Sequence, residues 1–383
     1  MDFMTLAVIG TVALVGSLLS LPRWLRLPVV VGELVAGIAL GRTGFHVINA
    51  DDPTLVFVAQ VGFALVMFVV GSHVPIRDPM VRAGARRGVV RAVGVGVLAV
   101  PAGLLLAHLF GTGHGALYAV LLASSSAALV LPAVGATGLS GRPLTDLLPQ
   151  VAVADAACIV ALPLAIDPAH VGRALVGVLV VAAFSWVLFL VLRTAERRGL
   201  RRRMHKISGR YDLALELRVS LALLFALAAL AAAFHVSVLL AGFGFGLVVA
   251  GIGEPRRLAR QLFGLTEGFL GPLFFVWLGS SLDLRALATH SSAIWLGLAL
   301  GAAALVLHGL VALDGVPVPI AVLAGAQLGV PVAAVTLGQQ LGLLAPGEGT
   351  ALLLGALVTI GAAAVAAGAI GRRYPSKPVA VLP

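Results

Sequence analysis

Long apolar stretches recur along all 383 residues and constrain the fold more than any other feature of the chain. A helix needs about 20 mainly apolar residues to cross the hydrocarbon core of a bilayer. The strands of a membrane barrel would alternate in hydrophobicity, and stretches such as Ala226 to Ala233 do not alternate. We therefore predict an all-α polytopic membrane protein with about 13 transmembrane helices. The predicted spans are residues 3–21, 28–43, 53–74, 89–110, 115–138, 145–166, 171–192, 212–234, 236–252, 266–284, 292–313, 316–344 and 347–370.

Composition excludes the soluble classes of protein. Hydrophobic residues make up 60% of the chain and charged residues 11%, whereas a typical soluble domain has about 25% charged residues. So little charge cannot cover the surface of a soluble enzyme or keep a chain disordered. The single Cys158 excludes a disulfide scaffold and a thiolate metal cluster. The sequence has no Walker-type phosphate loop and no His/Cys metal motif, so we expect no cofactor and no enzymatic activity.

Basic residues are concentrated on one predicted side of the membrane. All but four of the 26 Lys and Arg residues lie there; Arg42, Arg173 and Arg285 lie opposite, and Arg218 is near a helix start. The positive-inside rule then predicts a multi-pass protein of the cytoplasmic (inner) membrane, with its N-terminus outside and its C-terminus cytoplasmic. We expect the basic loop 193–211 to contact anionic lipid heads. The basic residues form no nucleic-acid-binding module, so we expect no nucleic-acid partner.

A short motif occurs twice at a constant offset. Gly71-Ser72 is followed by Arg77, and Gly279-Ser280 is followed by Arg285, 208 residues further along the chain. The offset spans seven predicted helices, which is an odd number, so the two copies face opposite sides of the membrane. Inverted repeats of this kind build many secondary transporters.

The same offset pairs two spans that are interrupted near the middle. One contains the segment Ser124–Ser126, and the other contains the segment Gln327–Pro331. Matched interruptions by polar, Gly or Pro residues predict discontinuous helices whose unwound backbone lines a polar transport site. The alternative is that these small residues only let helices pack closely.

Two titratable residues lie deep within predicted spans. Asp155 is about ten residues from either end of span 145–166, and His308 lies within the eleventh span. Desolvation disfavours an isolated carboxylate ion at this depth, so protons and small cations can compete for Asp155. The alternatives are a neutral Asp155 bonded to backbone and a His308 that only packs in the core. The other acidic residues are assigned to loops or helix ends, including Glu33 near a helix start and Glu348 in a loop.

Two further segments carry a family resemblance. The segment from Leu27 to Gly41 reads LPVVVGELVAGIALG; the segment from Phe269 to Val276 reads FLGPLFFV, with Gly279 and Leu282-Asp283-Leu284 following. Together they resemble hallmarks of the monovalent cation:proton antiporter family, the branch related to bacterial sodium/proton exchangers and potassium efflux systems. The resemblance extends over nearly all of residues 20–370.

The resemblance implies the architecture of the molecule. It implies a sodium/proton antiporter-like fold with inverted repeats and two crossed discontinuous helices, assembled as a homodimer. The implied parts are scaffold and dimerisation helices at 1–75 and 212–285, a mobile ion-translocating core at 89–166 and 292–370, a linker helix at 171–192, the basic cytoplasmic loop 193–211 and a short cytoplasmic tail at 371–383.

The resemblance also implies roles for individual residues. Asp155 matches the essential second acid of a pair, and Ala154 replaces its partner, or Ala156 if the alignment shifts by one residue. His308 occupies a position that is commonly Lys or Arg, and Gln327 is retained where many relatives have Gln-Arg-Gly-Glu. One carboxylate is then left to carry either ion, so electroneutral one-for-one exchange is the simpler expectation.

The expected function is secondary-active antiport of a monovalent cation, Na⁺ or K⁺, for H⁺. Asp155 would bind either ion in turn, as a transient metal ligand, and His308 would compensate the opposed helix ends or hold Asp155 when no cation is bound. The further ligands would be Ser124, Ser125, Ser126 and Gln327. Three alternatives stay open: a transporter of another small solute, a non-transporting pH-sensing homologue, and a membrane-embedded enzyme that uses Asp155 and His308.

Overall fold

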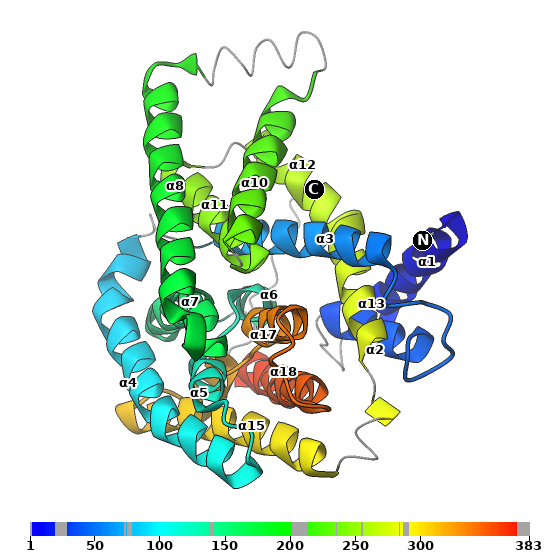
Figure 1. Ribbon diagram of the computed structural model, residues 1–383. Helices are drawn as coiled ribbons and strands as arrows, with labels where there is room; N and C mark the ends of the chain where they lie inside the picture. The colour runs from blue at the N-terminus through cyan, green and yellow to red at the C-terminus, as the bar shows by residue number, and fades with distance from the viewer. Residues whose placement is uncertain are drawn as a thin grey trace. The chain divides into compact units, whose positions relative to one another are not determined.

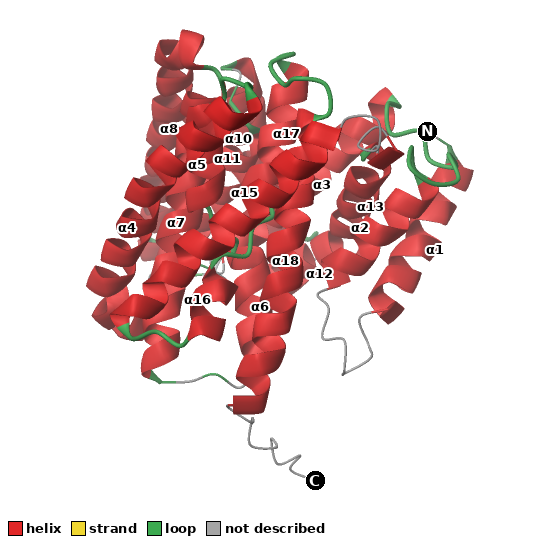
Figure 2. Cartoon of the chain, turned by 90° about the horizontal axis from the view of Figure 1, so that it is seen from below, coloured by secondary structure: helices red, strands yellow, loops and turns green. Residues whose placement is uncertain are grey.

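The computed structural model describes most of the chain. The described residues are 2–19, 29–72, 74, 79–137, 139, 141–200, 213–234, 236–253, 256–282, 284–285 and 291–373. They form helices joined by loops and, within these ranges, no strand (Figure 2). Much of the basic loop 193–211, most of the tail 371–383, and the motif residues Pro28 and Asp283 lie outside the described residues.

The chain divides into two compact units. The first holds most of α1 (Phe3–Leu19) and of α2 (Val29–Leu40). It also holds α3 (Pro53–Ser72), η1 (Pro168–His170), α8 (Val171–Arg197), α10 (Leu215–Ala233), α11 (Val238–Ile252), α12 (Arg256–Leu265), η2 (Thr266–Leu270) and α13 (Gly271–Ser281). The second holds α4 (Pro79–Phe110), α5 (Gly115–Ala123), α6 (Ala127–Thr137), α7 (Arg142–Ile166), α15 (Ser291–Gly309), η3 (Leu310–Asp314), α16 (Val318–Ala324), α17 (Gly329–Gln340) and α18 (Glu348–Arg373) (Figure 1).

Each predicted span contains a helix, but the helices differ in length. In the described ranges, nine helical segments are long and apolar enough to cross a membrane by length and composition. Shorter apolar helices lie at Phe3–Leu18, Gly115–Leu131 and Val238–Ile252. A multi-pass helical protein is therefore supported, and the number of thirteen crossings stays a prediction.

In the first unit, the repeated Gly-Ser motif forms two close helix crossings. A Cβ atom on Gly71 would collide with the backbone carbonyl of Phe243 in α11, and one on Gly279 would collide with that of Leu34 in α2. The following serines also behave alike, because Ser72 and Ser280 each donate from Oγ to the carbonyl three residues back, at 2.9 and 2.7 Å. Only glycine permits so close an approach of two backbones, which explains why the motif occurs in both repeats.

The second family segment also has a local structural role in the first unit. The five residues Thr266–Leu270 form a π-helical turn directly before Gly271 and Pro272. Proline has no N–H to donate within a helix, and its ring crowds the carbonyl four residues earlier. A π-turn accommodates this disruption without ending the helix. The stretch therefore stays helical through Ser281 while the phenyl rings of Phe63 and Phe274 stack at 4.6 Å.

In the second unit, helices related by the repeat make equivalent contacts. The helix α4 packs against α7, and α15 packs against α18. The interrupted pair α5–α6 contacts α7, and the interrupted pair α16–α17 contacts α18 (Figure 1). The second unit therefore consists of two similar sets of helices, each with one broken helix.

Candidate functional site

Both interruptions occur where the sequence predicts them. The helix α5 ends at Ala123 and α6 begins at Ala127, so Ser124, Ser125 and Ser126 form the first unwound segment. The serine side chains are at most 2% exposed. The helix α16 ends at Ala324 and α17 begins at Gly329, so the second unwound segment contains Gln327, which is 4% exposed. Each segment thus places polar groups and free backbone inside the unit.

Each unwound segment satisfies the end of the other broken helix. Nε2 of Gln327 donates to the carbonyl of Leu121 in α5 at 2.7 Å. Reciprocally, Oγ of Ser125 donates to the carbonyl of Ala324 in α16 at 2.6 Å. The last carbonyls of a helix have no partner within that helix, so buried ends need donors from elsewhere. The two bonds show that the broken helices cross at their unwound segments.

Asp155 lies at the N-terminal end of α6. It projects from the middle of α7 and is 4% exposed, and its Oδ2 accepts a hydrogen bond from the backbone N–H of Ala127 at 2.9 Å. Ala127 is the first residue of α6, where unpaired N–H groups and the helix dipole favour a negative charge. Among the described residues, Oδ1 accepts no hydrogen bond. One carboxylate oxygen is therefore held by the helix end and the other can bind an ion or a proton.

Thr359 holds the equivalent position in the other repeat. Its Oγ1 accepts from the backbone N–H of Gln327 at 3.1 Å, and the side chain is fully buried in α18. Because the repeat relates α7 to α18, Thr359 corresponds in role to Asp155. Thr359 is not among the residues predicted from the sequence, although it is a polar residue of α18 at the position that matches Asp155. The two equivalent positions thus carry one carboxylate, from Asp155, and one neutral hydroxyl, from Thr359.

His308 lies at the C-terminal ends of the two broken helices. The residue is 1% exposed, and its Cβ atom lies 3.2 Å from the position that a Cβ atom on Gly325 would occupy. Its ring faces the carbonyl groups of Leu122 and Ser124, but neither ring nitrogen makes a hydrogen bond of standard geometry within the described part of the chain. The imidazole therefore sits where helix dipoles favour positive charge, whereas Asp155 sits where they favour negative charge.

All six residues predicted for the site thus lie at or beside the crossing, but they do not form one bonded cluster. Ser124 donates from Oγ to the carbonyl of Leu121 at 2.8 Å, beside the bond from Gln327. No hydrogen bond or ion pair between described residues joins Asp155 to His308. The structure thus separates the two titratable residues onto opposite kinds of helix end. Their role in ion binding stays a prediction.

The assignment of Glu348 to a loop is wrong. Glu348 is the first residue of α18 and is 2% exposed. Its Oε1 accepts from the hydroxyl of Tyr118 at 2.7 Å and lies 2.7 Å from Nδ1 of His114, and its Oε2 accepts from the N–H of Ala345 at 2.8 Å. The sequence gives no local signal for this cluster, because Tyr118 is 230 residues away. Within the described residues, no group of three or more His, Cys, Asp or Glu side chains could hold a metal ion.

Comparison with known proteins places this chain in a family. Residues 10–373 match the family described as sodium/hydrogen exchanger, transmembrane. The structure is similar to that of the sodium proton antiporter MjNhaP1 from Methanocaldococcus jannaschii at pH 8, with a TM-score of 0.68 and 16% sequence identity. The similarity covers 95% of this chain and 99% of that chain, and no curated protein matches the sequence. The antiporter-like fold and the family resemblance are therefore confirmed. Since the family match spans nearly all of its residues, this chain belongs to the sodium/hydrogen exchanger family of membrane cation:proton antiporters.

Proposed function

We propose that this protein exchanges a monovalent cation, Na⁺ or K⁺, for H⁺ across the cytoplasmic membrane. Asp155 binds the cation or the proton, never both, because it is the one carboxylate that the described residues place at the crossing. A site with one exchangeable charge carries one positive ion in each direction, so the exchange is electroneutral. The concentration of Lys and Arg in the loops on one side supports the cytoplasmic orientation of those loops.

The observation that carries this proposal is the position of the Asp155 carboxylate. It is buried at the N-terminal end of α6, and one of its oxygens makes no hydrogen bond with described residues. A cation held by Asp155 would lie beside Ala127, which directly follows the unwound segment Ser124–Ser126. Discontinuous helices expose carbonyl and hydroxyl oxygens, which are the ligands that Na⁺ and K⁺ prefer.

His308 and Gln327 have a different role in this proposal. Both lie at the carbonyl ends of broken helices, where the helix dipoles place partial negative charge. Gln327 satisfies the carbonyl of Leu121, and His308 offsets partial negative charge without a hydrogen bond to the described residues. They keep the two unwound segments together and leave the ion to Asp155. The separation of His308 from Asp155 favours compensation of the helix ends over a direct bond between the two side chains.

The division into two compact units supports separate roles for a mobile core and a scaffold. The second unit holds both broken helices and every proposed site residue. We propose that it is the mobile core, that the first unit is the scaffold and dimerisation part, and that α8 is the linker. Movement of the core relative to the scaffold would expose Asp155 to one side of the membrane and then to the other.

The test is a pH-dye assay in everted membrane vesicles that contain the protein. After acidification of the vesicle lumen, added Na⁺ or K⁺ should dequench the dye in wild-type vesicles. The Asp155→Asn variant keeps an oxygen that accepts from Ala127 but lacks the exchangeable charge, so it should give no response. The Asp51→Asn variant changes a side chain that is 71% exposed and should respond as wild type does. No wild-type response to either cation, or an unchanged response in Asp155→Asn, would overturn the proposal.

A further inference from the structure

A groove lies between two helices of the second unit, away from the crossing. It has a volume of about 600 Å³ and is formed by α4 on one side and by α15 and η3 on the other. Its lining is polar at one end and apolar along the rest of its length. The residues that line it include Arg86, Arg87, Arg91, Gly94, Leu98 and Leu310.

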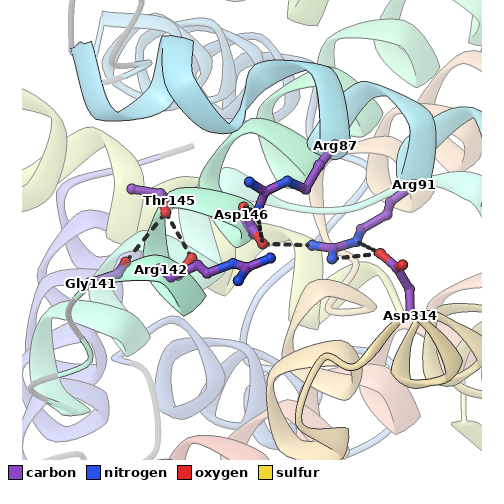
Figure 3. Close-up of polar contacts among 7 residues, drawn as sticks. All are labelled: Arg87, Arg91, Gly141, Arg142, Thr145, Asp146 and Asp314. Atoms are coloured by element: carbon purple, nitrogen blue, oxygen red, sulfur yellow. Dashed lines mark hydrogen bonds and ion pairs between the residues drawn. The ribbon is translucent and has the colours of Figure 1, made fainter.

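The polar end has more positive charge than negative charge. Nη1 of Arg87 lies 3.1 Å from Oδ1 of Asp146, and Arg91 bridges Asp146 and Asp314 at 3.4 and 2.6 Å (Figure 3). Arg86 is exposed and has no carboxylate partner among the described residues. Three guanidinium groups therefore face two carboxylates.

The arginines differ in what they can still bind. The side chain of Arg91 is 9% exposed, and its donors are directed to the two carboxylates. The side chain of Arg87 is 49% exposed, and its guanidinium uses only Nη1 toward Asp146. A guanidinium has five N–H donors, so the exposed Arg86 and the half-exposed Arg87 retain donors that no carboxylate of the described residues occupies. Such donors match the oxygens of a phosphate in pairs.

The rest of the groove is suited to hydrocarbon. Val90, Leu98 and Leu310 are 62%, 45% and 41% exposed, which is costly in water but favourable in lipid. Gly94 widens the groove between them, because a Cβ atom there would meet nothing within 4 Å. The apolar wall begins one helical turn from the arginines. This arrangement matches a ligand with a charged head group and an apolar tail.

We propose that this groove binds an anionic phospholipid. The phosphate would lie against Arg86 and Arg87, and one acyl chain would lie along α4 over Gly94 and Leu98 toward Leu310. Basic pockets between membrane helices bind anionic head groups in this way. A free phosphate ion also carries negative charge, but it has no acyl chain to contact the apolar wall of the groove. Because α4 and α15 both line the groove, a bound lipid would bridge the two helices. The proposal does not depend on antiport.

The test measures lipid binding to the detergent-purified full chain by native mass spectrometry and by thermal stability. The probes are phosphatidylglycerol, phosphatidylcholine and inorganic phosphate. Phosphatidylglycerol should bind and raise the melting temperature, and the other two should not. Inorganic phosphate that stabilises the protein as well as phosphatidylglycerol does would overturn the lipid assignment in favour of a free anion.

Two pairs of variants locate the site. Arg86→Gln removes an exposed, unpaired cation and should weaken phosphatidylglycerol binding about fivefold, whereas Arg373→Gln, at an exposed residue of α18, should not weaken it. Gly94→Leu should fill the groove and displace the acyl chain. Gly96→Leu is its matched control, because Gly96 is on the same helix, has equal open space and does not line the groove. Unchanged binding in Arg86→Gln, or equal loss in both glycine variants, would overturn the proposal.

Discussion

From the reciprocal hydrogen bonds at the crossing we predict how much stability the Ser125 hydroxyl contributes. In Ser125→Ala the carbonyl of Ala324 loses its Oγ donor at 2.6 Å, and it accepts no other hydrogen bond from the described residues. Ala324 is 1% exposed, so water cannot replace the donor. An unsatisfied buried carbonyl costs about 1–3 kcal/mol. The removal of one hydroxyl oxygen leaves little empty volume, so the free energy of unfolding should fall by about 2 kcal/mol.

Ser124 provides an internal control for this reasoning. Its Oγ also donates to a helix-end carbonyl, that of Leu121, at 2.8 Å, and it is as buried as Ser125. However, the Leu121 carbonyl also accepts from the backbone N–H of Ser124 at 3.0 Å and from Nε2 of Gln327 at 2.7 Å. Ser124→Ala therefore leaves no carbonyl unsatisfied and should cost less than about 1 kcal/mol.

The assay is thermal denaturation of both variants in the same detergent. One kcal/mol corresponds to roughly 2–4 °C in the melting temperature of a domain of 150–250 residues. Ser125→Ala should therefore melt several degrees below wild type, and Ser124→Ala should melt close to wild type. Equal melting temperatures for the two variants would refute the assignment of Ser125 as the donor that holds the end of α16.

Two further substitutions test packing and buried charge. Glu348→Leu leaves the hydroxyl of Tyr118 without its acceptor, so the free energy of unfolding should fall by about 1–3 kcal/mol for each unsatisfied donor. The measurement is the melting temperature, which should be lower than that of wild type. An unchanged melting temperature would contradict the bond. Gly279→Val places side-chain atoms against the backbone of Leu34 and should prevent α2 from packing on α13, seen as loss of folded protein after size-exclusion chromatography. Gly361→Ala, where a Cβ atom meets nothing within 4 Å, should fold normally.

The class of fold and the places where helices break can be predicted from the amino-acid sequence alone. A helix satisfies its own backbone hydrogen bonds, so apolar length alone predicts where a chain can cross a bilayer. Ser124–Ser126 and Gln327 could be recognised because polar and small residues interrupt apolar runs at matching positions of an inverted repeat. Asp155 and His308 could be recognised as candidate site residues because a charged group is costly deep in the bilayer.

Which groups contact one another depends on how the helices pack in three dimensions. Ser125 bonds to Ala324 across 199 residues, and Arg91 pairs with Asp314 across 223. Periodicity predicts which residues share one face of a helix, but contacts between helices depend on crossing angle and register, which no local spacing encodes. For this reason the sequence alone predicts neither the position of Glu348 in α18 nor the role of Thr359, although both are buried beside partners from distant segments. The separation of Asp155 and His308 onto opposite helix ends follows from the same packing.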